Sequence, residues 1–168
     1  DAHVFGTTVL ENLRVARGDV TSEEAMTALA TAGLAGWLAA LPDGLDTMLG
    51  PDARTVSGGE RRRLLLARAL LAPAPLLLVD EPAEHLDPDT ADALVTSLLG
   101  GPHVGSGERG VVVVTHRLTP LAAADEVVWL EAGRVTARGR HAELSVRLLD
   151  YGDAVRREQV TAVQRERA

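Results

Sequence analysis

The chain has 168 residues, of which 46% are hydrophobic and 2% aromatic. This composition excludes a disordered chain and predicts one globular domain with a core mostly of Leu, Val and Ala. A net charge of −7 argues against general nucleic-acid binding, and the absence of cysteine excludes disulfides and thiolate metal sites. No apolar run approaches the ~20 residues that a membrane-spanning helix needs. No signal peptide is visible. Because the chain starts at Asp1 rather than Met, we expect a fragment or a processed chain.

The first half of the chain predicts short helices joined by turns. Thr7 or Thr8 can cap a helix that runs through Arg14, after an opening loop. Thr21 and Glu24 form a Thr-x-x-Glu capping box ahead of a second helix. Beyond it we expect a helix end near Gly33, a short helix over residues 34–41, a turn at 42–44 and an irregular, exposed stretch over 46–56.

The second half alternates helices and strands, which predicts an α/β fold. Ser57 precedes a strong helix pattern over residues 60–72, and Pro73 ends it ahead of an apolar run at 76–79. This run and a second one at 111–114 predict buried strands of a parallel sheet. From Asp87-Pro88 we expect a helix with one apolar face, followed by a flexible loop at 100–110. The remaining expectations are a hairpin of residues 126–130 and 134–137, a helix at 141–149 and a solvated or fraying helix at 153–168.

Two adjacent carboxylates, Asp80 and Glu81, follow the first predicted strand, and Pro82 ends its hydrogen bonding. In open α/β sheets the carboxyl ends of the strands face the ligand crevice. Asp80 could hold Mg²⁺ there, and Glu81 could position a water as a general base. The alternative interpretation is a pair of solvated acids at a strand end.

Two further pieces could contribute to the same crevice. Ser57, Gly58 and Gly59 precede a helix, whose positive end and exposed amides favour an anion. His116 follows the second predicted strand and could donate a hydrogen bond to a phosphoryl group. Taken alone, the first could be an ordinary helix cap and the second a histidine bonded to backbone. The other four histidines show no metal-ligand spacing.

These pieces, in this order, resemble the ATPase domains of ABC transporters. VSGGE at 56–60 resembles their signature motif, LLLVDEP at 76–82 their Walker B strand, EHLD at 84–87 their D-loop, and His116 their switch histidine. Residues 131–135 and 139–144 are similar to the C-terminal subdomain of the exporter type. The resemblance implies part of a P-loop NTPase fold, a mostly parallel sheet with a helical signature subdomain. It implies a signature region at about 7–72, a core with a hairpin at 73–145 and a tail helix at 146–168.

The resemblance also assigns roles to residues. Asp80 would serve Mg²⁺, Glu81 would be the general base, and His116 would contact the γ-phosphate of ATP. Asp87 would communicate across a dimer of ATPase domains. The signature residues that would contact ATP held by the opposite subunit are Ser57, Gly58, Gly59 and Glu60.

The implied partners are a second ABC ATPase domain, as a homo- or heterodimer, and the transmembrane domain of an exporter. The implied location is the cytoplasmic face of a bacterial inner membrane. Nucleic acid is not among the expected partners. DAHVF at 1–5, LPDGLDT at 41–47 and EHLD look most like heterodimeric bacterial exporters of thiol reductants, cysteine or glutathione, that serve cytochrome bd assembly.

The sequence departs from the family in one major respect. A phosphate loop of the form G-x-x-x-x-G-K-[ST] is absent, since the chain contains no lysine. DAHVF resembles the stretch just after the Q-loop glutamine, so we expect the phosphate loop upstream of these residues. Smaller departures are Val56 for Leu, Glu60 for Gln, and Pro51-Asp52-Ala53 for Glu-x-Gly.

Three interpretations follow from the resemblance. The first is part of the ATPase domain of an exporter that couples ATP hydrolysis to transport. The second is a fragment that alone neither binds nor hydrolyses ATP appreciably, because the phosphate loop and its Lys are missing. The third is an ATPase of DNA repair or chromosome maintenance, which the acidic charge and the lack of sustained heptads disfavour.

Overall fold

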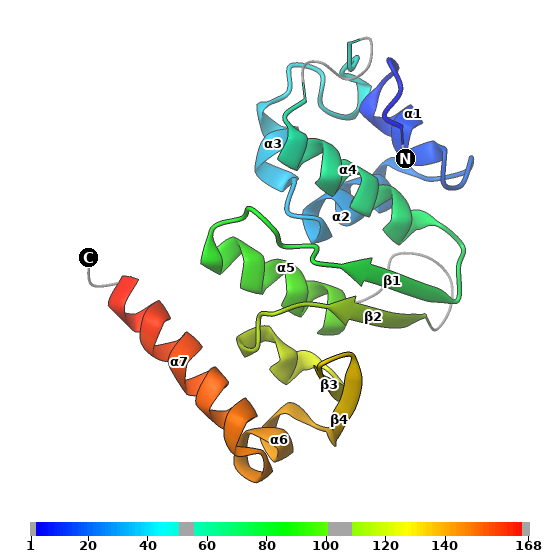
Figure 1. Cartoon of the computed structure of the whole chain (residues 1–168). Coiled ribbons are helices and arrows are strands. Elements are labelled where there is room, and N and C mark those ends of the chain that lie inside the picture. The colour runs from blue at the N-terminus through cyan, green and yellow to red at the C-terminus, as the bar shows by residue number, and fades with distance from the viewer. Residues whose placement is uncertain (1–2, 51–55, 101–108, 166–168) are drawn as a thin grey trace.

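The computed structural model describes residues 3–50, 56–100 and 109–165. In chain order the elements are α1 (Val9–Arg14), α2 (Ser22–Thr31), α3 (Ala35–Ala40), η1 (Gly44–Asp46), α4 (Gly58–Leu71), β1 (Leu76–Asp80), α5 (Pro88–Gly100), β2 (Gly110–Val114), η3 (Thr119–Ala123), β3 (Val127–Glu131), β4 (Arg134–Gly139), α6 (His141–Arg147) and α7 (Leu149–Arg165). Helices α1 to α4 gather at one end of the molecule, and β3, β4, α6 and α7 at the other (Figure 1). The pair β1 and β2 lies between them with α5.

Side-chain caps begin the first two helices as the sequence predicts. The Thr8 hydroxyl accepts a hydrogen bond from the Glu11 amide at the start of α1. Thr21 and Glu24 form the expected capping box at the start of α2. Gly33, with φ of +73°, follows the end of α2 and turns the chain into α3, as expected.

One expectation for the first half is wrong. The sequence predicts an exposed stretch around Leu49, but Leu49 is only 2% exposed and belongs to the larger hydrophobic core. Thr8 and Met48 form an antiparallel bridge, which draws this stretch back against the start of α1. Residues 51–55 of the same stretch lie outside the described ranges.

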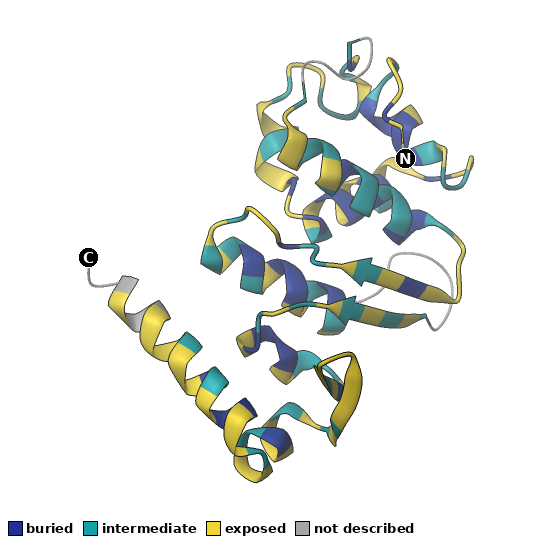
Figure 2. Cartoon of the chain, viewed as in Figure 1, coloured by how far each residue is buried: buried dark blue, intermediate teal, exposed yellow. Residues whose placement is uncertain are grey.

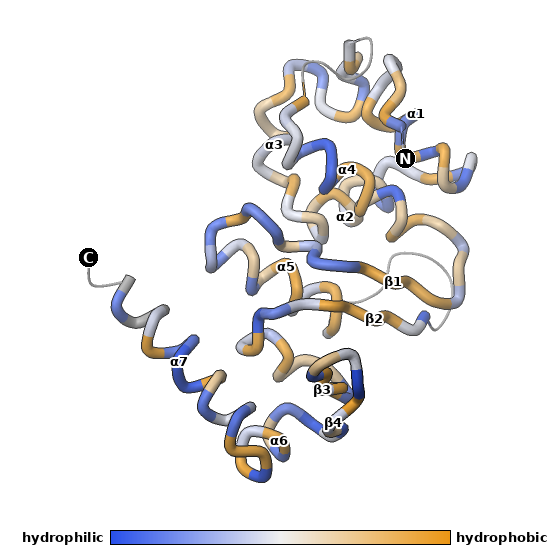
Figure 3. The backbone as a smooth tube through the Cα atoms, viewed as in Figure 1, coloured by the Kyte–Doolittle hydropathy of each residue, from blue (hydrophilic) through white to orange (hydrophobic). Residues whose placement is uncertain are grey.

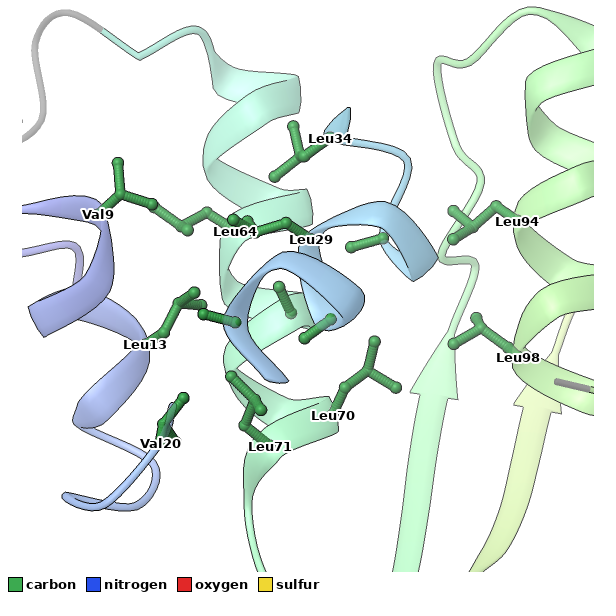
Figure 4. Packing of buried hydrophobic residues seen from close by; sticks show 14 of the residues in the cluster. Val9, Leu13, Val20, Leu29, Leu34, Leu64, Leu70, Leu71, Leu94 and Leu98 are labelled. Atoms are coloured by element: carbon green, nitrogen blue, oxygen red, sulfur yellow. The ribbon is translucent and has the colours of Figure 1, made fainter. Parts of the chain in front are cut away.

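Helix α4 lies at the centre of the larger core. It begins at Gly58, two residues before the expected start, because Ser57 caps it. Leu64 is fully buried and lies between Val9 of α1 and Leu29 of α2 (Figure 4). Packing on two sides therefore sets the direction in which the start of α4 points.

Strands β1 and β2 are parallel neighbours, with Asp80 opposite Val114. Leu77 is buried in the larger core on one face of this pair. On the other face Leu78 is 69% exposed and Val112 45% exposed. The prediction of two fully buried strands is wrong for this face. An apolar run is buried only where a second layer covers it, and in the described part of the chain none does. The residues along both strands are mostly hydrophobic, and hydrophilic residues follow where the strands end (Figure 3).

Helix α5 matches its prediction closely. Asp87 caps its first turn, and Pro88 is its first residue. Its buried residues recur at helical spacing and join the larger core: Ala91, Leu94, Val95 and Leu98. Figure 4 shows Leu94 and Leu98 among the residues of that core. Residues 101–108 of the expected flexible loop lie outside the described ranges.

The hairpin is also confirmed. Strands β3 and β4 pair in antiparallel fashion around Ala132 and Gly133. Both turn residues have positive φ, +48° and +75°, as the type I′ turn of a two-residue hairpin requires. Helix α6 then covers most of the range expected for it.

The expectation of a solvated or fraying helix over residues 153–168 is wrong at Val155, near the start of α7. Tyr151 is fully buried and Val155 is 6% exposed in a second, smaller core. The other members of that core are Leu118, Leu121, Val127 and Leu144. The tail therefore docks through its first turns, while most of its far end is exposed (Figure 2). In the described ranges no helix is both long and apolar enough to cross a membrane.

Tyr151 anchors α7 through polar as well as apolar contacts. Its hydroxyl lies 2.8 Å from Nδ1 of His141, and its ring meets Trp129 edge to face at 5.1 Å. Burial, helped by the negative charge of Glu158, raises the pKa of Tyr151 to about 12.

A spectroscopic titration tests this burial directly, because Tyr151 is the only tyrosine in the chain. We expect its phenolate absorbance to appear with a midpoint at about 12 rather than at the ordinary pKa of 10.0. The folded state holds this proton more tightly. The resulting stability is therefore complete below the ordinary pKa and is lost as pH rises towards the folded pKa. Tyr151→Phe should show no such transition. A midpoint at the ordinary pKa would mean that Tyr151 is exposed.

Candidate functional site

Three predicted site residues meet at the carboxyl edge of the parallel pair. Asp80 ends β1, Glu81 follows it, and His116 lies two residues beyond the end of β2. The Glu81 amide donates to the Val114 carbonyl at 2.9 Å, which extends the pairing of the strands by one hydrogen bond. Because parallel strands end at the same edge, side chains far apart in the sequence converge here.

Glu81 and His116 are directly bonded. Oε1 of Glu81 accepts from the His116 backbone amide at 3.1 Å and lies 2.9 Å from Nδ1 of its ring. An ionised carboxylate only accepts hydrogen bonds, so Nδ1 carries the proton in this contact. Nε2 is then the nitrogen left for a ligand, on a side chain that is 77% exposed.

The backbone of Glu81 is held in an unusual conformation. Its φ is +43°, in the left-handed region that L-residues with a side chain rarely adopt. Such a conformation costs on the order of 1–3 kcal/mol and persists only where surrounding contacts enforce it. The bonds of Glu81 to Val114 and His116 supply those contacts. Strain stored at a carboxylate on a sheet edge is typical of functional positions.

A cavity of about 390 Å³ lies beside the two carboxylates, and we call it the edge cavity. It is lined by the start of α4, by the end of β1 and by the loop that follows: Gly58, Gly59, Arg62, Arg63, Asp80, Glu81, Pro82, Glu84, His85 and Leu86. His116 is not among these residues and contacts Glu81 from the side of β2. The structure thus brings the glycines of the signature-like motif to the same cavity as the paired acids.

Ser57 and Glu60 point to a different role. They form a capping box in which Ser57 Oγ accepts from the Glu60 amide at 3.3 Å. Oε2 of Glu60 accepts in return from the Ser57 amide at 2.8 Å. Neither residue lines the edge cavity, although Ser57 is exposed. In this structure the two residues cap α4, so that the helix begins at Gly58.

Asp87 also lies outside the edge cavity. Its Oδ1 accepts from the Thr90 amide at 3.0 Å as the cap of α5. Hydrogen bonds from Thr90 lower the pKa of Asp87, because they favour its charged form.

The sequence reasoning missed Arg62 and Arg63, which line the edge cavity together with the acids. NH1 of Arg62 lies 3.3 Å from Oε2 of Glu84 and 3.2 Å from Nδ1 of His85. A signal for them existed. They follow Gly58 and Gly59 by four residues, which places each arginine one helical turn along the same face of α4.

Comparisons with known proteins show which fold carries this site. A sequence model of the family described as "ABC transporter" matches residues 2–84. The structure matches the one titled "Structure of a bacterial Atm1-family ABC exporter with ATP bound" with a TM-score of 0.69 and 30% identity. That match covers 94% of this chain and 27% of the exporter chain. The chain has the fold of a partial ABC ATPase domain.

Several curated proteins are similar to this chain. The mitochondrial iron-sulfur clusters transporter ATM1 of Saccharomyces cerevisiae is 39% identical over 144 residues, 86% of this chain. The glutathione/L-cysteine transport system ATP-binding/permease protein CydD of Bacillus subtilis is 36% identical over 142 residues, 84% of this chain. The ATP-dependent lipid A-core flippase of Vibrio cholerae is 34% identical over 145 residues, 86% of this chain. The chain spans 21%, 24% and 24% of the lengths of these relatives.

The residues of this domain can be tested for their fit to Mg²⁺. In the described ranges no group of three or more His, Cys, Asp or Glu side chains is arranged to hold a metal ion. Mg²⁺ does not require such a group, because it commonly binds one or two carboxylates together with phosphate oxygens and waters. Asp80 is exposed at the edge cavity and next to Glu81, so it fits this mode of binding.

The capping box predicts the effect of removing the Ser57 hydroxyl. Ser57→Ala should lower the free energy of unfolding by about 0.5–2 kcal/mol, because an amide at the start of α4 loses its partner. Urea unfolding followed by circular dichroism measures this change. Thr96→Ala is the control, since it removes a hydroxyl from the exposed side of α5. It should not lower stability, because alanine favours a helix more than threonine does. An unchanged midpoint in Ser57→Ala would contradict the cap.

Proposed function

We propose that this chain supplies the hydrolysis side of the ATP site in an ABC exporter. The observation that carries the proposal is the bonded pair of Glu81 and His116 at the strand edge, beside the exposed carboxylate of Asp80. In the proposed reaction a water attacks the γ-phosphate of ATP in line with the leaving oxygen.

Glu81 is suited to act as the general base. Only Oε1 contacts His116 in this structure, so Oε2 is the oxygen available to a water. The proton taken from water would come to rest on this carboxylate. His116 holds the carboxylate through its amide and Nδ1, and its Nε2 can donate to a γ-phosphate oxygen when the ring is protonated. A positioned base contributes about 10²–10⁴-fold to the rate.

Asp80 would hold Mg²⁺ together with phosphate oxygens and waters. The metal ion would neutralise charge that develops on the phosphates. Asp80 is positioned for this by β1, whose register against β2 sets its place at the edge.

The signature residues are proposed to act on a second domain. Ser57 is exposed at the start of a helix of 14 residues, and with Glu60 it lies outside the cavity that holds the chain's own acids. We propose that Ser57, Gly58, Gly59 and Glu60 contact ATP bound by a partner ATPase domain, and that Asp87 communicates between the two. The partner would be an identical or a related domain. A transmembrane domain would complete the exporter.

The phosphate cradle is proposed to come from sequence outside these 168 residues. The chain has no lysine and no phosphate-loop motif. The exposed face of β1 and β2, which includes Leu78 and Val112, is a natural packing surface for further elements of the same domain. We therefore expect the isolated chain to be inactive towards ATP.

The transported substrate is a finer proposal. Thiol reductants are supported by the motifs at 41–47 and 84–87 and by similarity to the glutathione/L-cysteine protein of B. subtilis. Relatives named for iron-sulfur clusters and for lipid A core have comparable identity. The similarities support the proposal of an exporter more strongly than they support any one substrate.

Replacement of the proposed base tests this function in the complete protein that contains these residues. Glu81→Gln should lower the rate of phosphate release from ATP by at least about 100-fold, because the amide cannot accept the proton from water. Glu126→Gln is the matched control, an exposed carboxyl ahead of β3, and should keep the original rate. The 168-residue chain alone should release no phosphate. Unchanged turnover in Glu81→Gln would show that Glu81 is not the base.

A further inference from the structure

A carboxylate from the C-terminal helix binds the segment that follows His116. Oε2 of Glu158, in α7, accepts from the Leu118 amide at 3.0 Å and from the Thr119 amide at 2.7 Å. It also accepts from the Thr119 hydroxyl at 2.9 Å. Oε1 adds a longer contact with the Leu118 amide at 3.3 Å. Glu158 thus satisfies consecutive backbone donors two and three residues beyond the proposed catalytic histidine.

The same segment is also held by α5. Nε of Arg117 donates to Asp92 at 2.6 Å, and NH2 donates to the carbonyl of Pro88 at 3.0 Å. The hydrogen bond with Asp92 raises the pKa of Arg117, and the charge of Glu158 acts in the same direction. Arg117 thus ties the segment to α5 through an ion pair and a backbone carbonyl.

We call residues 116–119 the switch segment. Each of its four backbone amides has a partner. The His116 amide binds Glu81, and the Arg117 amide binds the Thr115 hydroxyl at 3.1 Å. The amides of Leu118 and Thr119 both bind Glu158. Along four residues, the partners change from the proposed base to the C-terminal helix.

We propose that Glu158 is a positioning residue for His116. By binding the far end of the switch segment, α7 fixes where His116 lies and so maintains its contact with Glu81. The consequence for catalysis rests on the proposed function, whereas the consequence for the geometry of His116 does not.

The docking of α7 does not depend on Glu158 alone. Tyr151, Val155 and Glu158 lie on one face of α7, at i, i+4 and i+7. The first two are buried in the second core. Removal of the Glu158 carboxylate should therefore release the switch segment while α7 stays in place, which makes the positioning role separable from the structural one.

Amide hydrogen exchange on the 168-residue chain tests the geometric part. In Glu158→Ala we expect the amides of Leu118, Thr119 and His116 to exchange about tenfold faster, because the first two lose their acceptor and the third loses its support. The Trp129 amide, in β3, serves as the internal reference and should not change. Gln159→Ala is the matched control on the exposed side of α7 and should leave all these amides unchanged.

The conservative variant keeps the test decisive if Glu158→Ala unfolds the chain. Glu158→Gln retains one oxygen acceptor, so it should show a smaller acceleration at all three amides. If Leu118 and Thr119 exchange faster in either folded variant while His116 does not, Glu158 serves only to dock α7 and the proposal is overturned.

Steady-state kinetics of the complete protein test the catalytic part. Glu158→Ala should lower kcat for ATP hydrolysis by about tenfold or more, because misplacement of a catalytic group slows the reaction, and should leave KM unchanged. Glu158→Gln should restore part of kcat. Loss of activity in Glu81→Gln with full kcat in Glu158→Ala would reject the positioning role alone. Full activity in Glu81→Gln would instead reject the proposed function, and the exchange of the His116 amide would still decide the geometric proposal.

Discussion

One carboxylate oxygen joins the two parallel strands at their carboxyl ends. Oε1 of Glu81 accepts from both the amide and the ring of His116, while the Glu81 amide donates to Val114. These bonds hold Glu81 in a left-handed conformation that it would not adopt freely. The placement of Asp80 and of the edge cavity follows from the same junction, because both depend on where β1 ends. A change that separates Glu81 from His116 would therefore relax the whole edge.

The helices deliver other groups to this edge through rigid packing. Burial of Leu64 between α1 and α2 sets the direction of α4, and the capping box of Ser57 sets where the helix begins. Together they bring Gly58 and Gly59 to the acids. Helix α5 holds Arg117, and α7 holds the end of the switch segment through Glu158. Groups from three helices thus converge on two strand ends, which is how a small sheet can support a site built from distant residues.

Local rules predict much of this arrangement. Caps, the hairpin and the apolar face of α5 depend on neighbours a few residues away, so the sequence shows them directly. Asp80, Glu81 and His116 are predictable because parallel strands end at a common edge. The burial of Leu49 is not, because it requires the bridge between Thr8 and Met48. The exposure of Leu78 and the role of Glu158 depend on which layer lies opposite, and no periodicity reports that.

The protonation of the His116 ring tests the central claim most directly. Nitrogen NMR of the imidazole, in alkaline buffer where histidine rings are neutral, reports which ring nitrogen carries the hydrogen. Because the Glu81 carboxylate can only accept, the hydrogen should reside on Nδ1, and it should lose this preference in Glu81→Gln. A neutral ring with its hydrogen on Nε2 in the unaltered chain would contradict the junction of Glu81 and His116.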